Sequence, residues 1–455
     1  MRNTWRWLLA GFTTGGLVGI ALLAINIVGT ASGGAGAIRA DAAGQMDVLH
    51  TPPLLVSPAE STALSYEIVC SPEGQEPPKP CSPSGTLYVR AVGARSFDSV
   101  QLTRLPNGRF SYDVPASLEG GNGFEYYVTF QDGRGNSATV PAAGAAAPER
   151  AWIVSKWTTV DLGTHAFGAP RSPDSVVFKS GWGAGATDLG LNDGREQSRI
   201  GPSGFDVAAD GAVVVLDQVN HRLARYGNGS VEHFPIEFRG GEGDIAVAND
   251  QTVWVLDDGG AQGHVAVVRG YGAAGQLVGR ATLGAPLGEM LRAGPNGPVV
   301  HSYPSEMWLP VANGQVARTQ AQQVAGARAG RPVAGGREVV VRASPDEARF
   351  ALVAGNRVLS AWRVVSTTNL GEVQLAEPSG NGVTAIVRLW TESQAEFRVL
   401  QLGASGLAGS FDVTPAEWAE SAPLSRFRVH AGTLYQLQSS PAGAEVVAYR
   451  MGGAR

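Results

Sequence analysis

Two stretches of the sequence that share one pattern of apolar residues and turns constrain the fold most strongly. In the first, residues 201–226, apolar side chains alternate with small or polar ones on both sides of an Asp-Gly pair, Asp210 and Gly211. Alternation with a period of two predicts β-strands, and an Asp-Gly pair between two such runs predicts the turn of a hairpin. The stretch therefore predicts one β-hairpin of a repeating architecture.

The second stretch, residues 244–258, repeats the first at an interval of forty residues. Asp250 stands at its turn, as Asp210 does, and Asp257 ends its second apolar run, as Asp217 does. Looser copies, one before these two stretches and four after them, lie at intervals of about 35 to 50 residues. This is the period of a propeller blade, in which four strands form one sheet. These copies are residues 169–180, 290–302, 339–353, 373–389 and 426–438. The pattern predicts an all-β propeller.

The first stretch also resembles the NHL repeat. That repeat has a Pro, a Gly before an apolar residue, an Asp-Gly turn, an Asp after the apolar strand, and Asn-x-Arg before an aromatic residue. The matching residues here are Pro202, Gly204, Phe205, Asp210, Gly211, Asp217, Asn220, Arg222 and Tyr226. The resemblance implies a propeller that usually has six blades, and the seven turn signals leave seven blades open.

The polar residues of this stretch have two possible roles. In the repeats that it resembles, the Asn bonds the turn backbone and the Arg pairs with the Asp, which implies a structural role for Asp217, Asn220 and Arg222. Contact with a ligand is the alternative. We interpret His221 between them as a turn residue rather than a metal ligand.

The N-terminus predicts export from the cytoplasm. Residues 1–28 contain two arginines and then a run of twenty-two uncharged residues, which is long enough to span a bilayer as a helix. A cleaved signal peptide and an uncleaved membrane anchor both remain possible. Residues 29–48, rich in Gly and Ala, predict a flexible tether. We expect a protein at the cell membrane with extracytoplasmic domains, or a secreted protein.

Two globular units follow the tether. Residues 49–141 contain short alternating strands separated by turn signals, which predicts a small β-sandwich. The hairpin at residues 124–141 resembles the final hairpin of bacterial immunoglobulin-like and fibronectin type III-like modules. Residues 142–152 predict a linker, and residues 153–455 the propeller, whose ring would be closed by residues 152–162 pairing with residues 445–451.

Cys70 and Cys81 are the two cysteines of the chain, and the loop between them is rich in Pro and Gly. In an oxidising compartment this spacing favours a disulfide that closes the loop. Two free thiols are the alternative.

Motifs for chemistry are scarce. The sequence has no HxH or HExxH zinc motif, no GxSxG and no GxxxxGK. Glu242 resembles the first metal-binding Glu of gluconolactonase-like propellers, but no companion ligands can be assigned. Asp257 and Asp258 alone fall short of the six or more oxygens that calcium needs. We interpret Trp152, Trp157 and Trp182 as core residues, with stacking on sugars as the alternative.

The net charge of −5 and the absence of basic residues interleaved with aromatic ones exclude nucleic acid as an expected partner. We therefore expect a non-enzymatic binding or scaffold protein that needs no cofactor and binds a protein or a polysaccharide. The alternative is a hydrolase or lyase of the gluconolactonase or NHL-lyase type, with calcium or zinc on the propeller axis.

Overall fold

The computed structural model describes the chain from residue 38 to residue 452 with gaps. The described ranges are 38–39, 46–69, 83–119, 121–132, 135–141, 143–194, 198–241, 243–258, 266–283, 288–302, 307–311, 328–420 and 425–452. Nearly all regular structure in them is β-strand, so the predicted all-β class is confirmed. Within these ranges the helix α2 (Ala116–Glu119) is one turn long, and no helix has the length and apolar character to cross a membrane. The predicted signal peptide or anchor, residues 1–28, lies outside the described residues.

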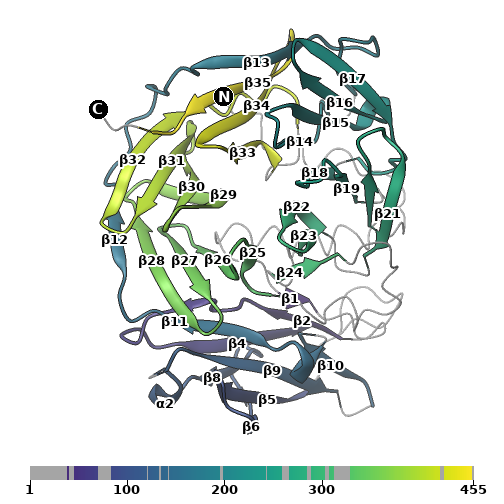
Figure 1. Cartoon of the computed structure of the whole chain (residues 1–455). Coiled ribbons are helices and arrows are strands. Elements are labelled where there is room, and N and C mark those ends of the chain that lie inside the picture. Colours follow the sequence, from purple (N-terminus) through teal and green to yellow (C-terminus); the bar gives the residue numbers. More distant parts are fainter. Residues whose placement is uncertain are drawn as a thin grey trace.

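The N-terminal unit is a sandwich of two sheets (Figure 1). Its first sheet has the order β1 (Ile38–Arg39), β2 (Asp47–His50), β4 (Ala63–Val69), β8 (Phe110–Asp113) and β7 (Thr103–Arg104). Its second sheet has the order β3 (Leu55–Val56), β11 (Glu149–Ile153), β9 (Gly123–Gln131), β5 (Ser84–Ala91) and β6 (Asp98–Gln101), and β10 (Ser137–Val140) pairs with β9.

The core of the sandwich follows from the alternation along its strands. Every second residue of β5 and β9 is buried, so one face of each strand points between the two sheets. There Leu87 and Val128 of the second sheet pack with Leu64 and Phe110 of the first sheet in one apolar cluster. Two sheets that bury one face each against the other form a stable unit.

Two predicted connections are partly strands. Part of the predicted tether, residues 29–48, lies in β1 and β2, because Met46 and Val48 are buried in the sandwich core. The predicted linker, residues 142–152, ends in β11, which pairs with β9 and runs parallel to β3. The reason is burial: Ala151 of β11 is fully buried in the sandwich core. The sandwich therefore extends to residue 153.

The described residues beyond the sandwich form six further sheets arranged in a ring (Figure 1). The first sheet has the order β14 (Gly204–Val207), β15 (Val213–Asp217), β16 (Arg222–Gly227) and β17 (Ser230–Pro235). The second has the order β18 (Gly243–Val247), β19 (Val253–Asp257), β20 (Val267–Tyr271) and β21 (Leu277–Thr282). The third has the order β22 (Gly288–Gly294), β23 (Gly297–Ser302) and β24 (Met307–Pro310).

The other three sheets complete the ring. The fourth has the order β25 (Arg331–Val333), β26 (Arg337–Ala343), β27 (Glu347–Ala354), β28 (Arg357–Val365) and β12 (Thr158–Asp161). The fifth has the order β29 (Asn369–Ser379), β30 (Gly382–Trp390), β31 (Ala395–Gly403) and β32 (Gly406–Val413). The last has the order β33 (Phe427–His430), β34 (Thr433–Ser440), β35 (Gly443–Arg450) and β13 (Ser175–Ser180). Radial sheets of this kind around one axis make the ring a β-propeller.

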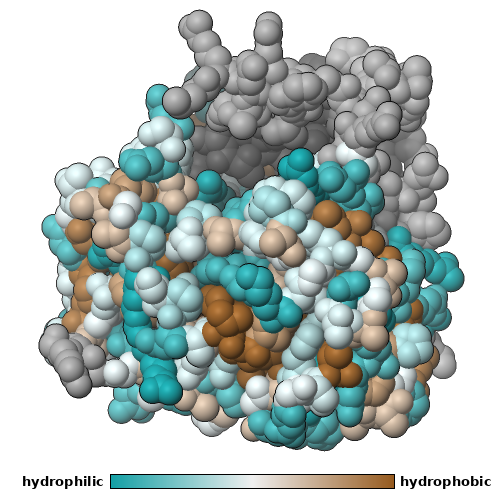
Figure 2. All heavy atoms as spheres, turned by 90° about the horizontal axis from the view of Figure 1, so that it is seen from above, coloured by the Kyte–Doolittle hydropathy of each residue, from teal (hydrophilic) through white to brown (hydrophobic). Residues whose placement is uncertain are grey.

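Neighbouring sheets of the ring pack through apolar faces. Strands β15 and β19 are buried at every residue, because both of their faces lie against other sheets. Between these two sheets, Leu216 and Leu223 pack with Ile245 and Val255. In the view of Figure 2, apolar residues of the described part form separate surface patches among polar ones.

The strand pairing corrects two predictions about ring closure. Residues 169–180 do not form a hairpin of their own, because β13 is the outer strand of the last sheet, where it pairs with β35. The predicted closing segment, residues 152–162, instead pairs elsewhere: β11 joins the sandwich and β12 runs parallel to β28. Residues 445–451 do lie in the closing sheet, as β35. β13 lies at the outer edge of its sheet, and only Phe178 and Ser180 of its six residues are buried, so its apolar content does not mark it as the closing strand.

Candidate functional site

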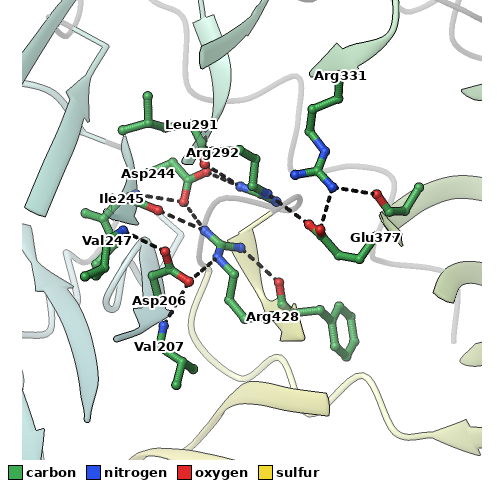
Figure 3. Close-up of polar contacts among 12 residues, drawn as sticks. Asp206, Val207, Asp244, Ile245, Val247, Leu291, Arg292, Arg331, Glu377 and Arg428 are labelled. Atoms are coloured by element: carbon green, nitrogen blue, oxygen red, sulfur yellow. Dashed lines mark hydrogen bonds and ion pairs between the residues drawn. The ribbon is translucent and has the colours of Figure 1, made fainter. Parts of the chain in front are cut away.

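A group of six charged side chains, buried or partly buried, lies at the ring axis. Each of the six sheets brings one charged side chain to the axis from the strand at its inner edge (Figure 3). In chain order they are Asp206, Asp244, Arg292, Arg331, Glu377 and Arg428, from β14, β18, β22, β25, β29 and β33. Three acids and three arginines give the cluster, which we call the axial cluster, no net formal charge.

Asp244 lies at the centre of the axial cluster. Its side chain is fully buried and accepts hydrogen bonds from Arg428 Nη2 at 2.6 Å and from Arg292 Nη1 at 2.7 Å. Its two oxygens also accept the backbone N–H groups of Ile245 and Leu291, both at 2.8 Å. The bond to Leu291 ties the inner strand of one sheet to that of the next. Both carboxylate oxygens are therefore engaged twice.

Asp206 makes the corresponding tie one sheet earlier. Its oxygens accept the backbone N–H of Val207 at 2.8 Å and that of Val247, on the next inner strand, at 2.7 Å. Arg428 Nε lies 3.5 Å from Asp206 Oδ1. Arg428, from the last sheet, thus contacts carboxylates of both the first and the second sheet of the ring.

Glu377 and Arg331 form the other half of the axial cluster. Arg331 Nη2 donates to Glu377 Oε2 at 2.5 Å and to the Ala376 carbonyl at 3.2 Å. Arg292 Nε lies 4.0 Å from Glu377 Oε1, so Arg292 connects the two halves. The ring therefore has a continuous chain of alternating charges across its axis (Figure 3).

Burial dominates the electrostatics of the axial cluster. Burial raises the pKa of Asp206, and the nearby Arg428 only partly opposes that shift. Burial together with the positive charge of Arg428 lowers the pKa of Arg292 to about 10. A charge buried in this way is costly unless a counter-charge lies beside it, and here Arg428 lies beside Asp206 and Asp244 beside Arg292.

This geometry favours a structural role for the axial cluster. A metal ion would need carboxylate oxygens that face a common point with open positions. Asp244 instead accepts four hydrogen bonds, and the Asp206 oxygens accept the amides of two adjacent inner strands. The arrangement holds the inner strands in register around the axis.

The predicted site residues Asp217, Asn220 and Arg222 lie together at the end of β15. Arg222 Nε donates to Asp217 Oδ2 at 2.7 Å, and Asn220 Nδ2 donates to the same oxygen and to the Gly183 carbonyl, both at 2.9 Å. Asp217 Oδ1 accepts the Gly190 N–H at 2.9 Å. These contacts fix the loop that leads from the last sheet into the first. His221 closes the short turn before β16 with a left-handed φ of 53°.

Asp257 occupies the same place in the second sheet. Its Oδ1 accepts the Gly240 N–H at 2.9 Å, and its Oδ2 accepts Arg239 N–H at 3.1 Å and Arg269 Nη1 at 2.8 Å. The two repeated Asp residues therefore anchor equivalent loops, each of which enters the inner strand of its sheet.

Of the remaining predicted positions, Asp210, Gly211 and Asp250 lie at turns and Gly204 begins β14. Asp210 and Asp250 accept the backbone N–H two residues on, from Ala212 at 3.1 Å and Thr252 at 3.0 Å. Gly211 has φ 83°, a conformation that glycine adopts without strain. At Gly204 an added Cβ would lie 3.0 Å from Asp244 Oδ1, so a side chain here would press on the axial cluster.

We expect the substitution Asp217→Asn to lower the free energy of unfolding by about 2 kcal/mol, because the fully buried carboxylate accepts three hydrogen bonds, one of them from an arginine. Asp210→Asn is the matched control. The Asp210 side chain is 56% exposed, and its pairing with Arg225 should contribute about 0.5 kcal/mol. Urea unfolding of the two variants measures both effects, and equal losses would contradict the anchoring role of Asp217.

One further cluster has the residue types of a metal site. His165, Glu396 and Asp412 place potential ligand atoms within 4.8 Å of one another. Arg398 lies among them: it donates to Asp412, and its Nη2 lies 3.1 Å from His165 Nδ1. Because arginine cannot accept, Nδ1 accepts that bond, and Nε2 carries the proton that it donates to Glu396 at 2.8 Å. Both imidazole nitrogens are engaged, so the cluster forms a closed hydrogen-bonded group.

The other predicted residues give no site. Cys70, Cys81 and Glu242 lie outside the described residues. The tryptophans contact other side chains: an arginine lies over Trp152 and over Trp157, and Trp182 stacks on Trp418 with ring centroids 6.1 Å apart. Two cavities among the described residues, of about 10 and 20 Å³, are the size of a water molecule.

Sequence reasoning missed the axial cluster. Its six members come from strands that are far apart in the chain, and no local spacing relates Asp206 to Arg428. Each repeat does have one charged residue in or next to its first apolar strand. An alignment of the repeats by their first strands would have shown these charged residues at one place in the repeat.

No family model matches the chain, and no curated protein matches it. Among solved structures, virginiamycin B lyase from Staphylococcus aureus is similar, with 9% identity over 55% of this chain and 94% of that chain and a TM-score of 0.34. A streptogramin B lyase has 8% identity, 54% and 92% coverage and a TM-score of 0.33. A protein of unknown function from Bacteroides thetaiotaomicron has 12% identity, 88% and 98% coverage and a TM-score of 0.33. The likeness is slight, and the propeller fold rests on the strand pairing described above.

Proposed function

We propose that this chain is an extracytoplasmic binding or scaffold protein, either secreted or held at the membrane by residues 1–28. Its six-sheet ring is a six-bladed propeller of the NHL-like type that presents a binding face to a protein or a polysaccharide. The sandwich, of the immunoglobulin or fibronectin type III kind, holds that face away from the membrane.

The observation that carries this proposal is the engagement of the axial cluster. The alternative, a metal-dependent hydrolase or lyase, needs several acidic or histidine side chains that converge on one point and remain open. Asp206, Asp244 and Glu377 do converge on the axis, but each lies against an arginine and the two aspartates also accept backbone amides. This use of the charges supports a scaffold rather than a catalyst.

The proposed binding face is the one that bears the loops between successive sheets. We call it the connecting face, and among the described residues it includes 181–194, 198–203, 236–241 and 414–420. Asp217 and Asp257 anchor two of these loops from within. Above the anchors, Arg199, Arg239 and Asp193 expose 47%, 62% and 54% of their side chains. Exposed loops on a rigid scaffold are the usual place for recognition.

Retention of ligands on the immobilised full chain tests the proposal. We expect the chain to retain one member of a panel of soluble polysaccharides or a protein of the envelope extract from the producing cells. The double variant Arg199→Glu, Arg239→Glu should lose at least tenfold in affinity, which is about 1.4 kcal/mol. Arg280→Glu is the control, because Arg280 is exposed within the outer strand β21 rather than in a loop between sheets.

Metal analysis and fractionation complete this test. The full chain should sediment with membranes or leave the cell, and it should carry less than stoichiometric calcium and zinc. Stoichiometric metal together with turnover of a lactone or polysaccharide would instead support the enzyme. Equal retention by the double variant and the control would contradict the connecting face as the binding surface.

A further inference from the structure

A continuous segment, residues 157–180, runs along the outside of the ring from the sandwich to the last sheet (Figure 1). We call this segment the belt. It precedes the ring in the chain and passes the three sheets that end the ring. It makes specific contacts with each of them, and these contacts are of three different kinds.

The first fastening is a strand. In the belt, β12 pairs in parallel with β28, with Thr158 opposite Trp362 and Asp161 opposite Val365, and Leu162 N–H continues the ladder to the Val365 carbonyl at 2.9 Å. β12 is the fifth strand of its sheet, outside β28. Val160 is 5% exposed and belongs to the apolar cluster between this sheet and the next.

The second fastening is the closed group around His165. Glu396 on β31 accepts His165 Nε2 at 2.8 Å and the Gly168 N–H at 2.7 Å, so one carboxylate holds two points of the belt. The His165 and Glu396 side chains are 1% and 9% exposed. Thr164 adds a surface hydrogen bond to Thr367 at 2.8 Å.

The third fastening closes the ring. Asp174 N–H donates to the Ala448 carbonyl at 2.9 Å, and β13 then pairs with β35 from Ser175 to Ser180. Phe178 of β13 also stacks on Tyr226 of the first sheet, with ring centroids 3.8 Å apart and planes within 3°. The belt therefore joins the last sheet to the first.

The near end of the belt is tied to the sandwich. Arg349 on β27 donates to Glu60 Oε1 at 2.8 Å and to the Leu55 carbonyl at 3.2 Å, and its guanidinium lies over the Trp157 ring at 5.3 Å. Trp152 of the sandwich packs with Val340 and Ala351 of the ring in one apolar cluster. A movement of the sandwich against the ring would therefore act on the belt directly.

A strand from the N-terminal side usually completes the last sheet of a propeller, so the closure by β13 is expected of this fold. We propose that the belt in addition acts as a lock that couples this closure to the sandwich, with Glu396 as its middle fastening. The ring opens between its last and first sheets only when the belt detaches along its length. This inference concerns the fold and is independent of the proposed binding function.

Amide hydrogen exchange of the full chain tests the lock, because exchange of buried strands reports the opening of cooperative units. In Glu396→Gln, an NH2 group replaces one carboxylate oxygen. One of the two belt donors, His165 Nε2–H or the Gly168 N–H, then faces another donor instead of an acceptor. We expect amide exchange to become about tenfold faster at residues 163–168, because one charge-assisted hydrogen bond is lost. The lock predicts the same acceleration at the β13–β35 ladder, beyond the site of the change.

Asp257→Asn is the matched control, since Asp257 is a buried carboxylate that accepts loop amides and an arginine but does not touch the belt. It should accelerate exchange near residues 239–240 and leave β13 and β35 unchanged. Acceleration confined to residues 163–168 in Glu396→Gln would overturn the lock. If Glu396→Gln does not fold, the milder Thr164→Ala, which removes a surface hydrogen bond, takes its place. It should accelerate exchange by a smaller factor at residues 163–168 and at the β13–β35 ladder. Unchanged exchange at β13 in this variant would also overturn the lock.

Discussion

Replacing Arg428 by methionine should lower the free energy of unfolding by about 3 to 5 kcal/mol, the loss typical of breaking a buried ion pair by removing one partner. Arg428 is 4% exposed, and its guanidinium lies against the fully buried Asp244 and against Asp206. Methionine fills much of the same volume but leaves both carboxylates with less positive charge in a dry environment. Urea unfolding at neutral pH measures the loss.

Two comparisons isolate the charge from the packing. Arg388→Met removes an arginine whose side chain is 44% exposed and whose partner Glu372 lies 3.7 Å away, so it should cost about 0.5 kcal/mol. Adding Asp244→Asn to Arg428→Met should lower the stability further, because Arg292 then loses the carboxylate that it pairs with and the new amide nitrogen faces a backbone N–H. If Arg428→Met costs no more than Arg388→Met, the axial cluster does not hold the ring together.

The hairpins of the ring were readable from the sequence because each is a local pattern. The turns at residues 210–211, 250–251 and 296–297 lie between strands that pair as predicted, and the looser copies at residues 373–389 and 426–438 do so as well. The hairpin at residues 339–353 also forms, but it is the second and third strand of its sheet, since β25 lies inside it.

What could not be read depends on residues that meet only in the closed ring. Asp206 has the place of a solvent-facing residue in an alternating strand, yet its Oδ2 accepts the Val247 N–H of the next inner strand. The belt shows the same limit. Residues 152–162 follow the linker directly and were therefore predicted to close the ring, but the strand order gives that role to β13. An outer strand is specified by its backbone partner rather than by its own apolar content.

The stability of the sandwich should fall as the pH is lowered from about 6.5 to about 4, because of His50. This side chain is 2% exposed and stacks on Tyr66 with ring centroids 4.3 Å apart. Its Nδ1 donates to the Ser65 carbonyl at 2.8 Å, since a carbonyl oxygen only accepts, and its Nε2 lies 2.7 Å from the Tyr126 hydroxyl. Burial lowers its pKa to about 4, and the bond to Ser65 only partly opposes that shift. The imidazole is therefore neutral at pH 7, and Nε2 accepts the Tyr126 hydroxyl.

The sign follows from proton binding. Between pH 4 and 6.5 the unfolded chain binds a proton at this histidine and the folded chain does not, so the folded state loses stability as the pH falls. The contribution is complete above about pH 6.5, and about 3 kcal/mol is lost by pH 4, below which both states are protonated. Urea unfolding at pH 7.0, 5.5 and 4.5 should show this slope in the unchanged chain. His50→Gln can bond Ser65 and Tyr126 without titrating, so it should be less stable at pH 7.0 but less dependent on pH, and parallel pH curves for the two chains would contradict the neutral, buried His50.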